Sequence, residues 1–550
     1  MIFLSLVVLS VFIAKAQSDT FSAVCKIQGL VKTEKGLFTA FKEYIKAEEL
    51  LNNDVPGDVE KFSQNIHSKV KHTRADAEYC GNPINAFHIM SRFVNEWRPM
   101  FEQLFCETCL IFNTFSELNS TVAQLEQKIY GFPIERDLKS VSVSILRLWP
   151  FYRLDVKDLA DGIIRDTKTD RLELSEMFYI AKVAEEQGMY YEEIIWLNRM
   201  LELTLSSDRD KEEIEQFIIC KKLARAYFSY GMPWKSLDVL SECLRLEPDN
   251  LKLERDREWY QRKVDMLDDS QWQVTLKPKN YSETHHAQFE VYTKLCNGDE
   301  LRTPAEKSKL KCFLKPSKIP YLRGKEEVLN YDPRLSMFHD VISEGEMMDV
   351  KRLGEQKLER SQHLSDSGQK IVDESYRISQ TGWIADEEHT LINKLSRRIE
   401  LLTGLALQQK PLHSDCEKLQ VLNYGVGGMY EPHTDYFGNP LGAPPIPSDP
   451  AELRGTGDRI ATWLYYLSDV KFGGSTVYPY LRIQVPVTKG SAAFWYNLKR
   501  NGSPDIKTLH AACPVLLGSK WVSNKWIREG GQMFNRPCGL HVDETDYPVN

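Results

Sequence analysis

Apolar residues recur at helical spacing over residues 17–140, from which we predict a helical N-terminal domain. On one predicted helix the apolar face consists of Leu37, Phe38, Phe41, Tyr44 and Ile45. A second series between Phe115 and Ile129 repeats at intervals of three and four residues, as in a coiled coil. This pattern fits self-association through the helices, as in a dimerisation domain, and equally a bundle formed within one chain.

Residues 150–255 show a weak internal repeat of helix pairs, with Gly188 and Gly231 at corresponding positions. The second pair approaches the spacing of a tetratricopeptide repeat (TPR), and stacked repeats of that kind form a concave groove. Aromatic side chains concentrate here, among them Tyr190, Tyr191, Tyr227 and Tyr230. They serve either the packing of the helices or a groove for a proline-rich segment, whose stiff backbone loses little entropy on docking. We predict a TPR-like peptide-binding domain.

From about residue 336 the pattern changes to short β-rich segments that follow one helix. The helix is predicted over 344–355, and the clearest strands over 419–424, 459–467, 491–496 and 521–526. Closely spaced short strands are typical of an antiparallel barrel or a double-sheet jelly roll. We therefore predict an α+β multidomain protein with a double-stranded β-helix as its catalytic domain over 336–540. A connecting region rich in Lys, Pro and Asn precedes it over 256–335.

The 550-residue chain has an ordinary globular composition, with 42% hydrophobic and 27% charged residues. A net charge of −8, without a basic run or a glycine-rich phosphate loop, gives no indication of nucleic-acid binding. Residues 1–16 form a short apolar run ending in Ala-Lys-Ala, which predicts a secretory signal peptide; the run is too short for the alternative, a membrane anchor. No membrane span is expected elsewhere. Sequons at Asn119 and Asn280 fit this compartment and are expected to be glycosylated.

The cysteines number eleven, so at least one has no intramolecular partner. Cys296 and Cys312 bracket one short segment, and Cys513 and Cys538 bracket another. We therefore predict the disulfides Cys296–Cys312 and Cys513–Cys538.

The residue types of an iron site occur among the predicted C-terminal strands. His433 and Asp435 are two residues apart, so on a strand their side chains point to the same face. His510 follows 77 residues later and completes two His and one carboxylate, the facial triad of non-haem Fe(II) oxygenases. Ten residues further on, Lys520 lies in an apolar segment, where an ammonium group is costly without an anionic partner. In an Fe(II) oxygenase that anion is the distal carboxylate of 2-oxoglutarate. A zinc hydrolase could use the same three ligands but leaves Lys520 without a role.

Residues 419–537 resemble the catalytic domain of the collagen prolyl 4-hydroxylase alpha-subunit family. The matching segments are LNYGVGGMYEPHTDYF, RIATWLYYLSDVKFGGSTVYP, GSAAFWYNL and HAACPVLLGSKWVSNKWIREGGQMFNRPC. The aromatic repeat region is similar to the family's peptide-substrate-binding domain, and the N-terminal helical part to its dimerisation domain. The resemblance implies a procollagen-proline 4-dioxygenase, which hydroxylates peptidyl proline at C4 with O2 and 2-oxoglutarate and releases succinate and CO2.

Position by position, the resemblance also implies roles for single residues. His433, Asp435 and His510 match the iron ligands, and Lys520 matches the residue that binds the C5 carboxylate of 2-oxoglutarate. Tyr424 and Thr462 match positions that line the co-substrate pocket, whereas Tyr430, Trp526 and Arg377 match positions near the substrate proline. The two predicted disulfides match disulfides of the family.

The resemblance further implies ascorbate, which restores oxidised iron, and protein disulfide isomerase as the beta subunit of an α2β2 tetramer in the endoplasmic reticulum lumen. Collagen-like or other proline-rich secretory chains are the implied substrates. Met189, Arg225 and Phe228 differ from the residues expected in the peptide-binding domain, so its preferred peptide stays open.

The two alternative functions are a peptidyl lysyl hydroxylase and a non-catalytic subunit. Lysyl hydroxylases use Arg where Lys520 stands, and the intact ligand set argues against a non-catalytic collagen-binding chaperone subunit.

Overall fold

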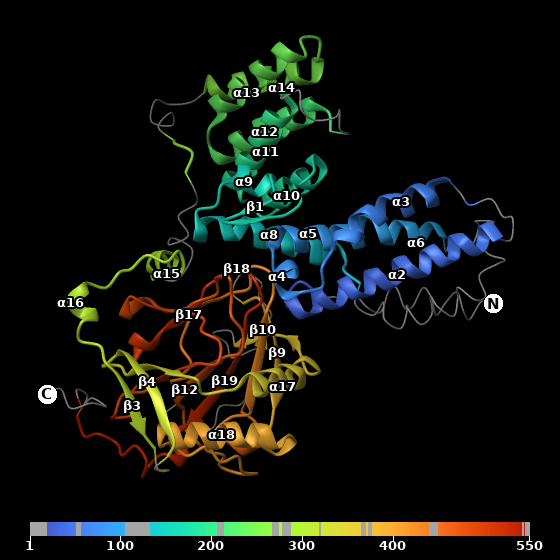
Figure 1. The fold of residues 1–550 in the computed structure, drawn as a ribbon. Coiled ribbons are helices and arrows are strands. Elements are labelled where there is room, and N and C mark those ends of the chain that lie inside the picture. Colours follow the sequence, from blue (N-terminus) through green and yellow to red (C-terminus); the bar gives the residue numbers. More distant parts are fainter. Residues whose placement is uncertain are drawn as a thin grey trace. The chain divides into compact units, whose positions relative to one another are not determined.

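The computed structural model describes residues 19–50, 55, 57–104, 132–205, 214–266, 274–277, 288–317, 319, 321–364, 370–371, 377–438, 449–541 and 544. The chain forms two compact units, of which the first comprises residues 1–134 with 285–550 and the second residues 135–284. Figure 1 labels their helices and strands. None of the described helices is long and apolar enough to cross a membrane.

The first unit begins with the predicted helical region. Its helices are α2 (Val24–Leu50), α3 (Gly57–His72), α4 (Ala77–Cys80), α5 (Pro83–Ser91), the π-helical turn η1 (Arg92–Trp97) and α6 (Arg98–Leu104). Phe41 on the predicted apolar face of α2 is buried, edge-on to the rings of Phe62 and Trp97. This face therefore packs within the chain. The coiled-coil-like series from Phe115 to Ile129 lies outside the described residues.

The C-terminal part of the first unit consists of antiparallel sheets. A nine-stranded sheet has the order β3-β4-β5-β16-β12-β19-β10-β9-β6, and a four-stranded sheet the order β11-β17-β14-β15. The larger sheet contains β3 (Cys312–Pro316), β4 (Arg323–Asn330), β5 (Leu335–His339), β16 (Ala492–Tyr496), β12 (Arg459–Tyr466), β19 (Trp521–Arg528), β10 (Leu419–Tyr424), β9 (Ser379–Ile384) and β6 (Glu359–Arg360). The smaller contains β11 (Tyr430–His433), β17 (His510–Ala512), β14 (Thr476–Tyr478) and β15 (Ile483–Val485). Two short pairs are β13 (Phe472–Gly473) with β18 (Val515–Leu517), and β7 (His363–Leu364) with β8 (Lys370–Ile371).

Alternation along the central strand β12 separates two cores. Trp463 and Tyr465 belong to a core that includes residues of α17 (Glu344–Glu355) and α18 (Thr390–Thr403). Leu464 and Tyr466 point the other way, into a core shared with the four-stranded sheet. Helices thus cover one face of the large sheet, and the small sheet packs on the other, as expected for a jelly roll.

The sheet starts earlier in the chain than the sequence predicted. The strands β3 and β4 fall within the region 256–335, where only a connection was expected. They form an edge of the large sheet, and along β4 exposed and buried residues alternate only in part, which explains why the pattern gave no strand signal. A short helix, α15 (Phe289–Cys296), precedes them, followed by α16 (Pro304–Lys307).

The second unit is built of consecutive helices that pack on one another, with a two-stranded hairpin between α9 and α10. The elements are α8 (Glu135–Tyr152), α9 (Val156–Ala160), β1 (Ile163–Ile164), β2 (Thr167–Lys168), α10 (Leu174–Glu186), α11 (Tyr190–Leu205), α12 (Gln216–Tyr230), α13 (Pro233–Leu246) and α14 (Leu251–Val264). Gly188 and Gly231 have φ of 67° and 95°, a left-handed conformation that favours glycine and ends a helix. They therefore close α10 and α12, as their repeat positions predicted.

The disulfides differ from both predicted pairs. Cys296 bonds to Cys513, 217 residues away, whereas Cys312 and Cys538 are exposed free thiols. Short spacing misled the prediction, because α15 folds back against the small sheet and brings Cys296 to the end of β17 (Tyr292 Oη donates to Ala512 O at 3.0 Å).

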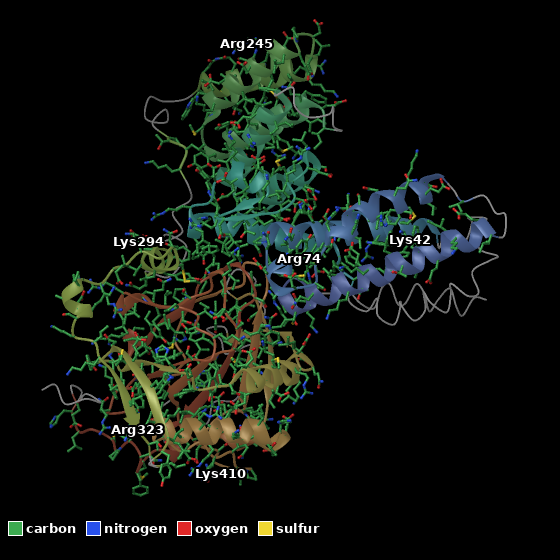
Figure 2. All side chains as sticks on the ribbon, viewed as in Figure 1. Lys42, Arg74, Arg245, Lys294, Arg323 and Lys410 are labelled. Atoms are coloured by element: carbon green, nitrogen blue, oxygen red, sulfur yellow. A yellow bond between two sulfur atoms is a disulfide. The ribbon has the colours of Figure 1, made fainter. Side chains whose placement is uncertain are left out.

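Another disulfide, Cys220–Cys243, joins α12 to α13. Figure 2 shows how side chains fill the interior of each unit. The six residues labelled there are all exposed: Lys42, Arg74, Arg245, Lys294, Arg323 and Lys410.

Candidate active site

A cavity of about 1530 Å³ opens in the first unit. Its wall includes His433, Asp435 and His510 together with Lys520 and Tyr424. The cavity exceeds the roughly 300–1000 Å³ of a typical small-molecule pocket. It has room for a small acid and for part of a larger substrate.

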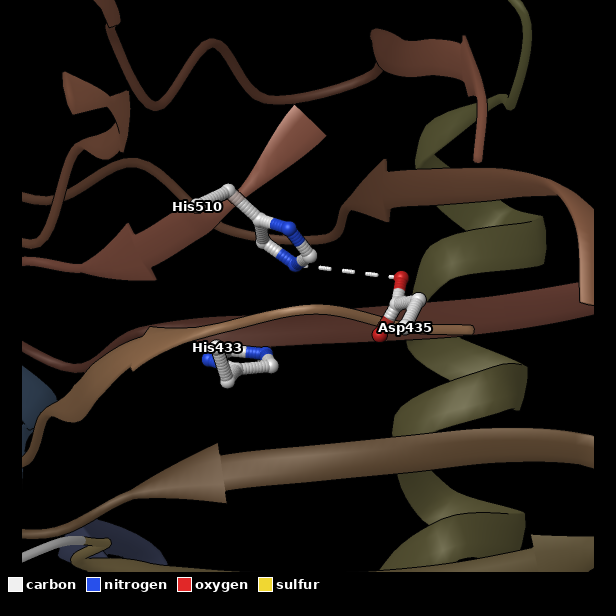
Figure 3. Close-up of side chains that lie close together, drawn as sticks. All are labelled: His433, Asp435 and His510. Atoms are coloured by element: carbon white, nitrogen blue, oxygen red, sulfur yellow. Dashed lines mark ion pairs between the residues drawn. The ribbon is translucent and has the colours of Figure 1, made fainter. Parts of the chain in front are cut away.

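The three predicted metal ligands meet where the strands β11 and β17 pair. His433 and His510 are direct register partners, with ring centroids 4.4 Å apart. Asp435 lies in the bend after β11, not on the strand as predicted, and the bend returns its carboxylate to the rings. One nitrogen of each histidine and one oxygen of Asp435 lie within 4.8 Å of one another. Figure 3 shows the three side chains converging, with the dashed line joining His510 to Asp435 at 3.7 Å.

Backbone carbonyls fix the tautomers of both histidines. Nδ1 of His433 donates to Glu431 O at 2.7 Å, and Nδ1 of His510 donates to Thr508 O at 3.0 Å. Each ring therefore carries its proton on Nδ1 and offers the lone pair of Nε2. Burial, and then the neighbouring His510, lower the pKa of His433 to about 3, so this ring is neutral at physiological pH.

The carboxylate of Asp435 is held in its ionised form. Burial alone would raise its pKa, but His510, His433 and a hydrogen bond from Thr462 lower the pKa below the usual value. Thr462 Oγ1 donates to Asp435 Oδ2 at 2.7 Å and accepts from Asn497 Nδ2 at 2.9 Å. Two imidazoles, each oriented by a backbone carbonyl, and one buried carboxylate form a donor set that fits Fe(II).

Thr462 has a different place from the one implied by the resemblance. It is fully buried behind Asp435 and does not line the cavity. Its hydroxyl orients the ligand carboxylate.

Lys520 occupies the end of the loop before β19 and is 1% exposed. Among the described residues, no acidic side chain lies within ion-pair distance of its ammonium group. Burial alone lowers the pKa of Lys520 to about 7. Its Nζ lies 4.8 Å from the ring centroid of Tyr424, another wall of the cavity. A buried ammonium group at the wall of a cavity, without a partner, fits a small anion such as the distal carboxylate of 2-oxoglutarate.

The residues predicted near the substrate proline line the same cavity. Tyr430 stacks on His433, with ring centroids 3.5 Å apart, and the guanidinium of Arg377 lies 4.6 Å from the Tyr430 ring centroid. The indole Nε1 of Trp526 is buried and has no hydrogen-bond partner among the described residues. A free donor at the cavity wall is suited to a peptide carbonyl.

The sequence analysis missed Arg459, the first residue of β12. Its guanidinium lies 3.7 Å from the ring centroid of Trp526 and bonds to both carboxylate oxygens of Glu417, at 2.7 and 2.8 Å. Burial lowers the pKa of Arg459, but the Glu417 carboxylate outweighs it and raises the pKa above the usual value. A signal was present, since an arginine that opens a strand as apolar as RIATWLYY needs a buried partner.

The other predicted site residues lie in the second unit or outside the described chain. Tyr191 stacks on Trp149 at 5.0 Å, and Tyr227 Oη accepts from Asn198 Nδ2 at 3.2 Å. Tyr230 Oη donates to Lys277 O at 2.8 Å, and Tyr190 is the first residue of α11. Asn119 and Asn280 lie outside the described residues.

Comparison with known proteins matches both parts of this architecture. Residues 23–166 match the model of the prolyl 4-hydroxylase alpha-subunit N-terminal region, and residues 419–528 that of the 2OG-Fe(II) oxygenase superfamily. The latter range contains the triad and Lys520. Membership in that superfamily implies Fe(II) and 2-oxoglutarate, which the donor set and the buried ammonium group fit.

Relatives match over almost the full length. Prolyl 4-hydroxylase subunit alpha-2 of Caenorhabditis elegans is 32% identical over 538 residues, covering 96% of this chain and 95% of the relative. Prolyl 4-hydroxylase subunit alpha-1 of Bos taurus is 32% identical over 541 residues, covering 96% of each. Among solved structures, the viral collagen prolyl hydroxylase from Paramecium Bursaria Chlorella virus-1 is 22% identical, with a TM-score of 0.26, and covers 35% of this chain and 95% of that one. On the identity and coverage of its relatives, the chain belongs to the family of prolyl 4-hydroxylase alpha subunits.

Proposed function

We propose that this chain hydroxylates peptidyl proline at C4 in collagen-like or other proline-rich secretory chains. The reaction consumes O2 and 2-oxoglutarate and releases succinate and CO2. The observation that carries the proposal is the buried Lys520, which has no acidic partner in the described part of the chain and lies at the wall of the cavity that contains His433, Asp435 and His510. A metal site alone fits several chemistries, but a metal site with a cation for a dicarboxylate fits this one.

Each group of the site has a defined task. Nε2 of His433, Nε2 of His510 and a carboxylate oxygen of Asp435 would hold Fe(II). Bound iron, with O2 and the keto acid, supplies the oxidising power that replaces a C–H bond of proline by C–OH. Lys520 binds the distal carboxylate of 2-oxoglutarate. Burial raises the pKa of Tyr424 to about 12, so its phenol stays neutral beside that carboxylate.

The peptide is positioned by other residues of the cavity wall, namely Tyr430, Trp526 and Arg459. Tyr430 stacks on the ligand His433 and lines the cavity beside it, where the substrate proline would have to lie. Trp526 lines the same cavity, and Arg459 restrains the indole by lying on its face. The alternative substrate, peptidyl lysine, gives these aromatic surfaces no ring to contact.

Substrate class is tested by succinate release from 2-oxoglutarate with a (Pro-Pro-Gly)n peptide and with a matched lysine-containing peptide. We expect turnover with the proline peptide and 4-hydroxyproline in the product. Turnover with the lysine peptide and none with the proline peptide would contradict the proposal.

The co-substrate site is tested by Lys520→Ala. Loss of a charge-assisted contact in a buried site is expected to raise the KM for 2-oxoglutarate by one to two orders of magnitude, as roughly 1.5–3 kcal/mol is lost. The matched control is Lys471→Ala, which removes an exposed lysine. An unchanged KM in Lys520→Ala would mean that another group binds the carboxylate.

The second unit supports a peptide-binding function. Its helices α10 to α14 follow one another as antiparallel neighbours, the arrangement from which TPR-like grooves are built. Tyr190, Tyr191, Tyr227 and Tyr230 all belong to α11 or α12. We include in the proposal that this unit binds proline-rich segments of the substrate.

The remaining parts of the proposal rest on family membership. They are self-association through the N-terminal helices, protein disulfide isomerase as the beta subunit of an α2β2 assembly, ascorbate as the reductant of oxidised iron, and the endoplasmic reticulum lumen as location. Purification from secretory membranes, followed by identification of co-purifying subunits, tests assembly and location together. Recovery as a lone chain from the cytosol would contradict both.

A further inference from the structure

The N-terminal segment Asp19–Cys25 is built into the catalytic core. Phe21 is 1% exposed, and Ala23 and Cys25 belong to the same apolar core as Val421 on β10. Two polar anchors hold the segment: Arg360 Nη1 pairs with Asp19 Oδ1 at 2.9 Å, and Gln380 Nε2 donates to Asp19 O and Ser22 Oγ at 2.6 and 2.9 Å. We call residues 19–25 the N-terminal strap.

The strap lies directly against the loop that joins Tyr424 to Tyr430. Val426 N donates to Phe21 O at 3.2 Å. A Cβ on Gly425 would lie 2.1 Å from the same oxygen, so only glycine allows this approach. The glycine-rich stretch before the metal ligands is therefore shaped in part by the strap.

The side chain of Asn423 connects the strap to Lys520. Its Oδ1 accepts from Cys25 N at 3.1 Å, and its Nδ2 donates to Lys520 O and to Ser519 Oγ, both at 3.1 Å. Lys520 O also accepts from Tyr424 N at 3.0 Å. Asn423 is fully buried, so each of these bonds is shielded from water.

A second N-terminal contact reaches the same loop. Gly518 N donates to Gly81 O at 3.3 Å, and a Cβ on Gly81 would lie 2.1 Å from Gly518 O. Two segments of the N-terminal region thus brace residues 518–520, Gly81 directly and the strap through Asn423.

The geometry points to a positioning role for the N-terminal strap: through Asn423 it fixes the backbone of Lys520 and so aims the ammonium group at the carboxylate of the co-substrate. The inference rests on the proposed function of Lys520. It predicts that 2-oxoglutarate affinity depends on a residue of the N-terminal helical region that touches neither iron nor substrate.

The hydrogen bonds from Cys25 N through the Asn423 side chain to Lys520 O are called the relay. Two variants of the full-length chain break the relay at different points. Cys25→Pro removes the N–H that donates to Asn423 Oδ1 and exchanges the small buried thiol for another apolar side chain; the position is the second residue of α2, in the first turn, where proline is tolerated because that N–H has no helical partner. Asn423→Ala removes the relay itself. The control is Gln28→Ala, which removes one hydrogen bond elsewhere in α2, to Ala75 O.

The measurement is calorimetric titration of 2-oxoglutarate into the Mn(II)-loaded protein without O2, together with steady-state kinetics. Both relay variants are expected to weaken 2-oxoglutarate binding roughly fivefold or more, with kcat and the peptide KM kept, while Gln28→Ala stays at the wild-type affinity. Hydrogen exchange should quicken at the amide of Tyr424, which donates to Lys520 O.

Unchanged 2-oxoglutarate affinity in both relay variants overturns the inference when Lys520→Ala weakens binding. An equal loss in kcat and peptide affinity also overturns it, because that pattern indicates general destabilisation. If Lys520→Ala itself leaves the affinity unchanged, the proposed function fails instead.

Discussion

A lysine buried without a counter-charge destabilises the protein that carries it, so its retention at Lys520 needs a ligand to explain it. Desolvation lowers the pKa of Lys520 to about 7, so without a bound anion its ammonium group loses its proton easily near neutral pH. A bound carboxylate favours the charged form and reverses this effect. Co-substrate binding and protonation of Lys520 are therefore linked.

This linkage predicts how the KM for 2-oxoglutarate depends on pH. Below about pH 7 Lys520 is protonated and binds the carboxylate; above its pKa of about 7 the proton is lost and the free site is neutral. The KM should therefore rise with pH, approaching tenfold per pH unit above the pKa. Kinetics between about pH 6 and pH 9 measure it.

The matched control is Lys520→Arg, whose guanidinium stays charged throughout this range. Its KM is expected to be higher overall but flat with pH. A flat profile in the wild type would show that Lys520 does not titrate in the free site.

Thr462 illustrates a residue whose role only the structure defines. Thr462→Val keeps the shape of the side chain but leaves Asp435 Oδ2 and Asn497 Nδ2 without their shared hydroxyl. Iron affinity is expected to fall about tenfold to a hundredfold, the usual effect of losing a group that orients a ligand. Equilibrium dialysis with Fe(II) or Mn(II) measures this, with His510→Ala as the reference for a lost ligand.

Thr403→Val serves as the control, since Thr403 Oγ1 donates to Ile399 O and accepts from Leu405 N, and bonds to no metal ligand. Wild-type metal affinity in Thr462→Val would mean that the carboxylate needs no donor behind it.

At the scale of elements, local pattern and chemistry predicted what each segment determines by itself. The helix Glu344–Glu355 and the strand Leu419–Tyr424 match their predicted ranges, because the local pattern of apolar residues is enough to predict them. The spacing of His433, His510 and Lys520 likewise indicated the site. The strands β3 and β4 were not predicted, because their position at the edge of the sheet leaves the apolar pattern incomplete.

Contacts between distant segments could not be predicted this way. The bond from Cys25 N to Asn423 Oδ1 spans 398 residues, and the disulfide Cys296–Cys513 spans 217. Nothing near Cys296 in the sequence distinguishes Cys513 from Cys312 as its partner. Such pairings follow from the packing of whole elements.

The disulfide between α12 and α13 gives a prediction at this scale. Cys220 and Cys243 close a loop of 23 residues, and loss of such a constraint costs about 3 kcal/mol in the chain-entropy model. The double variant Cys220→Ala with Cys243→Ala should show faster hydrogen exchange in α12 and α13, with the KM for 2-oxoglutarate unchanged.

Peptide mapping without reduction serves as the control, and is expected to show Cys220–Cys243 and Cys296–Cys513 in the wild type. A peptide joining Cys296 to Cys312 would contradict the structure. Unchanged exchange in the double variant would mean that helix packing alone holds the pair.

At the scale of the molecule, the N-terminal region belongs with the catalytic sheets, whereas residues 135–284 form a unit of their own. The sequence analysis placed the N-terminal helices in a separate domain. Ala23 and Cys25 of the strap belong to the same core as Val421 of β10, so the N-terminal region and the large sheet share apolar packing. None of the residues that line the cavity belongs to the described part of the second unit.

This division predicts that the two units affect different kinetic parameters. In Tyr191→Ala the second unit loses an aromatic surface that stacks on Trp149, and aromatic anchors of this kind contribute about tenfold or more to peptide affinity. The KM for long proline-rich peptides should therefore rise about tenfold. The KM for peptides too short to contact both units, and the KM for 2-oxoglutarate, should not change, because the site in the first unit is intact.

Arg245→Ala, at an exposed position of α13, is the control. An equal rise for short and long peptides would place the role of Tyr191 in folding, since only a binding surface separate from the active site makes the effect depend on peptide length.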